Sequence, residues 1–337
     1  MLFLSKSDFL AARSCETKLY YKKLQYPSLL DDDPYLEFLA DGGYMVEKMA
    51  KLLFPDGREL GHLDDPQIAF EELSRRLQIA DGVFFEATVI HDNLLARVDI
   101  LQRNATNLTV IEVKSGSIDS RGNHPNPLRG QGGNILSKYR EYLEDLAFQC
   151  LVLGRAFPGF TIIPKLCLVD KSTTATANST FDKFSLRRSR ECVSRVRSEI
   201  EYTGDVSRLQ AEHMLAFVEA ASEVSELQAE VAAAADRLAA TLVHNPIQRI
   251  TPEIGQKCKN CEYRLPQESG QSNGFRECWG ELADANPHVL DLCTWGSNTV
   301  NAPLKGRYFI WMHARVIGDC ESGGFEINKK ERIRMAH

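Results

Sequence analysis

The pattern of apolar and polar residues predicts helices first and then a group of strands. An opening helix, with Ser7 as its N-cap, ends before the turn YPSLLDDDP, and helical periods follow in residues 43–54 and 65–78. From residue 83 the period shortens to two, which is typical of strands. The strand-like segments are residues 83–90, 94–102 and 108–115, with short polar breaks between them. The chain is therefore predicted to form a three-stranded β-meander preceded by helices.

A long helix and a further strand are predicted after the meander. A loop rich in Gly, Asn and Pro (SRGNHPNPLRGQGGN) leads into a helical period over residues 135–155, and residues 160–170 read as a strand. Residues 189–243 are predicted to be mostly helical, and a cysteine-bearing segment follows at 251–280. The order helix, three strands, helix, strand, with added helices, predicts an α/β fold.

Composition narrows the class of protein. The chain has 337 residues, of which 43% are hydrophobic and 26% charged, as expected for a globular protein. A net charge of −6 argues against a protein that coats nucleic acid, but it leaves room for an enzyme with a local basic groove. No apolar run approaches the roughly 18 residues of a membrane helix, and the first residues do not resemble a secretory signal. The expected location is therefore the cytoplasm, with no membrane partner.

Three charged residues of the predicted meander could form a catalytic group. Asp99 lies in its second strand, and Glu112 and Lys114 lie in its third. Residues two apart in a strand share a face, so all three converge if the two strands are neighbours. Carboxylates are ligands of Mg²⁺, which lowers the pKa of a bound water, and a lysine can neutralise charge on a phosphate. Each residue alone would be an ordinary solvated side chain, whereas the combination predicts metal-dependent phosphodiester hydrolysis.

The pattern Asp99…Glu112-Val113-Lys114, within this order of elements, resembles the PD-(D/E)xK nuclease superfamily. It is most similar to the RecB-type branch, which includes CRISPR-adaptation and AddB-like nucleases, and to an uncharacterised bacterial family that shares the N-terminal SKSDF…C motif. The resemblance implies a restriction-endonuclease-like core and Mg²⁺- or Mn²⁺-dependent cleavage of DNA, as an exonuclease on single-stranded or free ends. It assigns metal binding to Asp99 and Glu112, and assistance to the nucleophile or transition state to Lys114.

Two further residues match the motifs of these nucleases. Gln149 shares a buried stripe of the predicted helix with Leu153, and a buried amide requires a hydrogen-bond partner. RecB-type enzymes have a tyrosine four residues after this glutamine, where the present chain has Leu153. Glu47 corresponds to the acidic residue on the helix before the meander. Its position opposite the apolar face of that helix fits a polar cleft as well as a solvated side chain.

The cysteines suggest a second kind of site. Cys258 and Cys261 form a CxxC pair, and Cys278 follows after sixteen intervening residues, a set suited to Zn²⁺ or an iron–sulfur cluster. A subset of RecB-type nucleases closes a [4Fe–4S] cluster with one N-terminal and three C-terminal cysteines. Cys15, followed by a Tyr- and Lys-rich stretch, matches that N-terminal cysteine. The resemblance therefore implies a structural [4Fe–4S] cluster, with a local zinc site as the alternative and Cys293 as the other choice of last ligand.

The resemblance covers residues 1–280, which are predicted to form the nuclease domain. Residues 281–337 are predicted to be a tail or the start of a truncated second domain. The alternative function is a non-catalytic nucleic-acid-binding or scaffold protein that keeps the fold and a zinc or iron–sulfur site. The complete Asp–Glu–Lys set favours the enzyme, because a degenerate nuclease is expected to lose one member.

Overall fold

The computed structural model describes the chain in two compact units. The described residues are 2–31, 33–61, 64–122, 126–175, 181–192, 195–266, 270–286 and 288–292. One unit comprises Met1–Lys22 and Asp32–Ile250, and the other comprises Lys23–Asp31 and Thr251–His337. Cys293 and most of the predicted tail lie outside the described residues.

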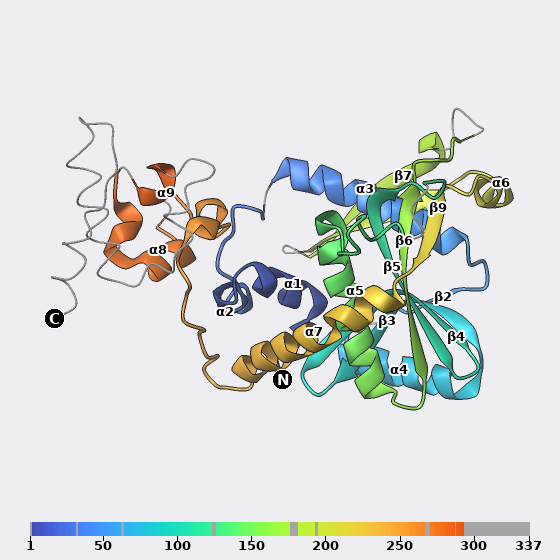
Figure 1. Ribbon diagram of the computed structural model, residues 1–337, viewed down its shortest axis with the longest axis horizontal. Helices are drawn as coiled ribbons and strands as arrows, with labels where there is room; N and C mark the ends of the chain where they lie inside the picture. Colours follow the sequence, from blue (N-terminus) through green and yellow to red (C-terminus); the bar gives the residue numbers. More distant parts are fainter. Residues whose placement is uncertain are drawn as a thin grey trace. The chain divides into compact units, whose positions relative to one another are not determined.

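A mixed sheet forms the centre of the first unit (Figure 1). Within the described residues it has seven strands: β1 (Leu4–Ser5), β2 (Arg58–Glu59), β3 (Gly82–His91), β4 (Leu94–Asn104), β5 (Asn107–Ile118), β6 (Thr161–Asp170) and β9 (Leu215–Glu219). The spatial order is β2-β3-β4-β5-β6-β9, and β1 pairs with β4 outside this path. The strands β3, β4 and β5 are antiparallel neighbours, whereas β6 is parallel to β5. The predicted meander and its following strand are confirmed.

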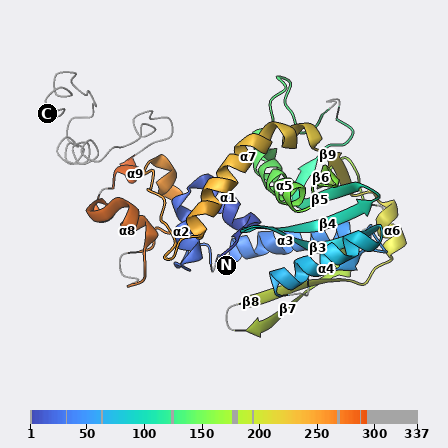
Figure 2. The ribbon, with the colours of Figure 1, turned by 90° about the horizontal axis from the view of Figure 1, so that it is seen from below.

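Helices cover both faces of this sheet. They are α1 (Lys6–Ser14), α2 (Thr17–Lys23), α3 (Pro34–Leu52), α4 (Pro66–Ile79), α5 (Ser137–Ala156), α6 (Val206–Ala211) and α7 (Ala221–Leu242). The helices α5 and α7 lie on one face and α3 on the other, as Figure 2 shows. None of the described helices is long and apolar enough to cross a bilayer. The prediction of an α/β fold is thus confirmed.

The start of α1 differs from the prediction. Ser5, not Ser7, is the N-cap, because it is the serine that precedes an acidic residue by three positions. The backbone N–H of Asp8 donates to the Ser5 hydroxyl at 3.2 Å, and the backbone N–H of Ser5 donates to Oδ2 of Asp8 at 3.0 Å. This is a capping box. The predicted single helix is also interrupted at Cys15, whose extended backbone separates α1 from α2.

Two other helix predictions need correction. The helix α3 begins at Pro34 rather than at residue 43, since the Asp33 side chain caps it and proline is favoured in the first turn. Residues 189–192 and 195–202 are not helical. They belong to a hairpin of β7 (Phe184–Cys192) and β8 (Arg195–Tyr202), which follows a 3₁₀ turn at Phe181–Lys183. In RVRSEIEY the apolar residues alternate with polar ones, which is the period of a strand.

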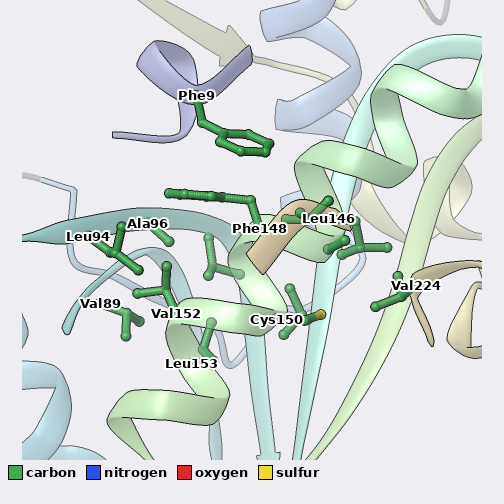
Figure 3. Close-up of a cluster of buried hydrophobic side chains, with 14 of the residues drawn as sticks. Phe9, Val89, Leu94, Ala96, Leu146, Phe148, Cys150, Val152, Leu153 and Val224 are labelled. Carbon is green, nitrogen blue, oxygen red and sulfur yellow. The ribbon is translucent and has the colours of Figure 1, made fainter. Parts of the chain in front are cut away.

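The main core lies between the sheet and the helices α1, α5 and α7 (Figure 3). Phe9 of α1 stacks on Phe148 of α5, with ring centroids 4.8 Å apart and an interplanar angle of 22°. Neither side chain is exposed to solvent. Leu94 and Ala96 of β4 and Val152 of α5 belong to the same cluster. This packing fixes the N-terminal helix against the helix that follows the meander.

The second unit is built around a small apolar cluster of its own. Within its described residues, its elements are the 3₁₀ helices η2 (Gln256–Asn260) and η4 (Gly280–Asp284) and the helices α8 (Gly274–Trp279) and α9 (Val289–Leu292). Phe275 and Trp279 stack in the centre, with centroids 5.5 Å apart. The three cysteines Cys258, Cys261 and Cys278 all pack against this cluster.

Replacing Phe148 by alanine tests the main core. The expected loss in free energy of unfolding is about 3–5 kcal/mol, because the change removes a fully buried ring and leaves a cavity beneath Phe9. Urea unfolding of the Phe148→Ala variant measures it. The control is Ile79→Ala at a position that is 70% exposed, which should stay within about 0.5 kcal/mol of the parent chain. Equal losses in the two variants would contradict this account of the core.

Candidate active site

The sheet forks at the residues singled out in the meander. β4 pairs with β5 from Ile100 to Asn104, but its first residues, Leu94 and Leu95, pair with β1 instead. Between these two paired segments lies Asp99. Its Oδ2 accepts a hydrogen bond of 2.8 Å from the backbone N–H of Val113 in β5. A side chain thus takes the place of a ladder hydrogen bond where β5 begins to leave β4.

The backbone of β3 is irregular at the same level, although its register with β4 is unchanged on either side. The flanking register pairs are Phe85 with Ile100 and Ala87 with Val98. Between them Glu86 lies opposite Asp99, and Glu86 has a φ of 52°, a conformation that residues other than glycine rarely adopt. The pairing of β5 with β6 also shifts, between Val113 and Ser117. Irregularities of this kind re-aim side chains, and here they surround the charged residues.

Glu112 is the centre of the charged group. Its side chain is only 1% exposed, and it contacts two ammonium groups and one amide. Lys6 Nζ lies 3.1 Å from each carboxylate oxygen, and Lys114 Nζ lies 2.6 Å from Oε1. The side-chain amide of Gln149 donates to Oε2 at 2.6 Å. A buried carboxylate needs such partners, because an unpaired charge away from water is very costly.

Asp145 joins the group from α5, one helical turn before Gln149. Its Oδ2 accepts a hydrogen bond of 2.6 Å from Lys114, and its Oδ1 accepts one of 3.2 Å from Gln149. Gln149 is fully buried, and its Oε1 has no hydrogen-bond partner among the described residues. An orphaned buried acceptor beside three carboxylates would suit a water molecule held in the site.

The close approach of α5 to β5 also positions Lys114. Gly116 lies against the ring of Tyr142, where an added Cβ would come within 2.8 Å of the ring carbons. The ammonium of Lys114 lies 5.8 Å from the centroid of that ring, within the range of a cation–π contact. A side chain at position 116 would therefore displace the Tyr142 ring that contacts the lysine.

The electrostatics of the group follow from burial and from the two lysines. Burial opposes the negative charge of Glu112, but Lys6 and Lys114 overcome it and hold the pKa of Glu112 below its usual range. Burial and the charge of Glu112 raise the pKa of Asp99 well above its usual value. The same two causes raise the pKa of Asp145 to about 7. The three carboxylates therefore share fewer than three negative charges near neutral pH.

Glu47 lies at the margin of this group. It forms an ion pair of 2.7 Å with Lys51 one turn later in α3, and Lys51 also contacts Glu59 and Glu86. After burial and the charge of Glu112, the charge on Glu47 also raises the pKa of Asp99. The helix predicted to precede the meander therefore brings Glu47 to the edge of the site rather than into its centre.

All five residues singled out in the sequence lie in or beside this group, but two others were missed. Lys6 and Asp145 contact Glu112 or Lys114 directly, and neither belongs to the motif. Asp145 could have been found from its spacing, because it lies four residues before Gln149 and so shares its helix face. Lys6 gave no such signal, since only the pairing of β1 with β4 brings it to the site.

The predicted cluster ligands belong to two units. Cys258, Cys261 and Cys278 gather at the apolar cluster of the second unit, and the backbone N–H of Cys261 donates to the carbonyl of Cys258 at 3.3 Å. Cys15 lies in the first unit, at the junction of α1 and α2. No group of three or more His, Cys, Asp or Glu side chains in the described parts of the chain is already arranged around a metal position. The assignment of these four cysteines stays a prediction.

Comparisons with known proteins found no match. The chain matches no family model, no curated protein and no solved structure. The case for its function therefore rests on the side chains of the site.

The raised pKa of Asp145 predicts a pH effect on stability. A carboxyl that keeps its proton up to about pH 7 when folded, but loses it near pH 4 when unfolded, makes the folded state less stable as pH rises through that window. Asp145→Asn mimics the protonated form. Thermal unfolding in EDTA should show that its stability falls less than that of the parent chain between pH 5 and pH 8, by about 2 kcal/mol.

Asp236→Asn is the control for this measurement. Asp236 is 55% exposed and its pKa is lowered by hydrogen bonds from Arg155, so its titration ends below pH 5. The stability of Asp236→Asn should therefore change between pH 5 and pH 8 by the same amount as that of the parent chain. An equally steep fall in Asp145→Asn and the parent chain would show that Asp145 is ionised throughout this range.

Proposed function

We propose that this protein is a metal-dependent nuclease of the PD-(D/E)xK type that hydrolyses phosphodiester bonds in DNA. The observation that carries the proposal is the convergence of Asp99, Glu112 and Lys114 at the fork of the sheet. The support of Glu112 by Gln149 adds to it, because a buried amide on the following helix was expected from the RecB-type pattern. The order of α3, the meander, α5 and β6 is also that of the predicted core.

The donor atoms of the site fit a hard divalent cation. Oδ1 of Asp99 and both oxygens of Glu112 lie within 3.6 Å of one positively charged atom, Nζ of Lys6. One cation can therefore be reached by both carboxylates. Mg²⁺ commonly takes one or two carboxylates and completes its shell with water and phosphate oxygens. Asp99 and Glu112 would hold such an ion, and Mn²⁺ has the same preference for oxygen ligands.

The residues of this site have separable tasks in the proposed reaction. A bound Mg²⁺ or Mn²⁺ would supply a Lewis acid and lower the pKa of a coordinated water. Lys114 is fixed between Glu112 and Asp145, and burial is outweighed by these two carboxylates, so its pKa is raised and it stays protonated. Its ammonium can stabilise negative charge that develops on a phosphate. Gln149 and Asp145 hold Glu112 and Lys114 in register, and Glu47 supports the site from α3.

The preferred substrate in this proposal is DNA with single-stranded or free ends, attacked as by an exonuclease. This part rests on the resemblance of the motif to RecB-type nucleases. The structural [4Fe–4S] cluster rests on the same resemblance and on the gathering of Cys258, Cys261 and Cys278 at one apolar cluster. Thiolates are suitable ligands for iron–sulfur clusters, and metal binding contributes directly to folding.

Cleavage assays with labelled single- and double-stranded DNA in Mn²⁺ test the nuclease. The parent chain should cleave DNA, and Lys114→Ala and Glu112→Gln should each reduce the rate by about 10²-fold or more, because each removes a charge that acts on the reacting phosphate or its metal. Lys165→Ala is the control. Lys165 pairs only with exposed Glu219 among the described ion pairs of its side chain, and its loss should leave the rate unchanged.

Two outcomes would overturn the proposal that the protein is a nuclease. One is the absence of cleavage by the folded parent chain on every DNA substrate with Mn²⁺ or Mg²⁺. The other is cleavage that Lys114→Ala leaves undiminished. Binding of DNA without cleavage would favour the non-catalytic nucleic-acid-binding protein instead.

Anaerobic purification tests the cysteine site. The visible spectrum should show the broad absorption of a [4Fe–4S] cluster, and Cys258→Ser or Cys261→Ser should abolish it and lower the unfolding temperature, because thiolates hold the cluster. Cys150→Ser is the matched control. Cys150 is buried in the main core with a pKa raised to about 12 by burial, so it is no thiolate and its replacement should leave the colour. A colourless protein with one bound zinc would contradict the iron–sulfur assignment.

A further inference from the structure

Lys6 places a second ammonium group in the site, in addition to that of Lys114. Its Nζ lies 3.1 Å from both oxygens of Glu112, 3.6 Å from Oδ1 of Asp99 and 3.9 Å from Oδ1 of Asp145. Three carboxylates thus surround one atom. Lys114, by contrast, forms ion pairs with Glu112 and Asp145 but, among the described residues, none with Asp99. Lys6 is therefore the cation that joins the two proposed metal ligands.

The backbone of Lys6 is fixed on both sides. Ser5 pairs with Leu95 in the sheet and caps α1, of which Lys6 is the first residue. Phe9, one turn later, is buried against Phe148. The Lys6 side chain itself is 22% exposed. The side chain therefore reaches the carboxylates from a rigid origin, and it is not fully enclosed by the protein.

A divalent cation and the Lys6 ammonium compete for the same place. A metal bound by Asp99 and Glu112 would have to lie between their oxygens, where Nζ of Lys6 now lies. Like charges at such distances repel strongly in a partly buried site. Without either cation, however, three carboxylates would face one another with Lys114 alone to compensate them.

We propose that Lys6 is a built-in counter-cation, which occupies the position between Asp99 and Glu112 when no divalent ion is bound and yields it when one binds. This inference rests on the proposed function, because it concerns the same carboxylate pair. Lys6 keeps the metal-free site folded and, by competition, weakens the binding of metal. It is a positioning residue, distinct from Lys114, whose contacts leave the Asp99 side of the site open.

Lys6→Met separates these effects, because methionine keeps an unbranched chain and removes the charge. Calorimetric titration with Mn²⁺ should show binding to Lys6→Met about tenfold tighter or more than to the parent chain, since a competing charge is lost. In EDTA the variant should unfold at a lower temperature, because buried carboxylates lose a partner, and saturating Mn²⁺ should narrow this gap. The control is Lys165→Met, which removes the same charge at a pair with exposed Glu219 and should bind Mn²⁺ as the parent chain does.

The outcomes distinguish this inference from the proposed function. If the parent chain binds Mn²⁺ and Lys6→Met binds it equally well or more weakly, Lys6 does not compete with the metal. The proposed nuclease function is unaffected by this result. No binding by either protein overturns both. Binding by Lys6→Met alone supports the competition and identifies Lys6 as the reason that the parent chain binds metal poorly.

A second measurement needs no variant and remains decisive if Lys6→Met does not fold. Brief acetylation of the parent chain, read out residue by residue by mass spectrometry, should modify Lys6 several-fold more in saturating Mg²⁺ than in EDTA, because the displaced amine turns to solvent. Lys165 should be modified equally in both conditions. Equal modification of Lys6 in the two conditions would overturn the exchange.

Discussion

The burial of one carboxylate, that of Glu112, is the constraint on which the rest of the site depends. A charge that is only 1% exposed must be compensated by partners from within the fold. Lys114 comes from the same strand, Gln149 from the helix after the meander, and Lys6 from the first turn of the chain's first helix. The N-terminus, the meander and α5 are thus held to one point by charge as well as by the stacking of Phe9 on Phe148.

The fork in the sheet is what makes this burial compatible with access. If β5 continued beside β4, backbone hydrogen bonds would close the gap and the carboxylates would face neighbouring strands. Instead β1 takes the pairing positions at the start of β4, while Asp99 bonds to the backbone of β5 as it leaves. The result is one deeply buried carboxylate and one, on Asp99, that is 15% exposed. In the proposed function, an ion or a phosphate would approach from the side of Asp99, the more exposed of these two carboxylates.

The sequence predicted the elements well where one face of a segment is buried. In β4 buried residues alternate with more exposed ones from Leu94 to Ile100, and α4 buries Ala69, Leu73 and Leu77 at regular spacing. Prediction from the sequence failed where the buried residues do not recur at the spacing of a helix or a strand. The first half of α3 exposes Tyr35 and Phe38, so its only signal was the Asp33–Pro34 start. The participation of Lys6 depends on a two-residue strand, which no periodicity can reveal.

The charges themselves argue that the site is not there for stability. Replacing a buried ionic group by well-packed apolar residues is often neutral or stabilising, so a core that keeps three carboxylates and two lysines carries a cost. The neighbouring network of Lys51 is more exposed at Glu59, whose side chain is 48% exposed, although burial raises the pKa of Glu86 there to about 7. Around Glu112, whose side chain is 1% exposed, the compensation comes from the protein or from a cation that the protein binds.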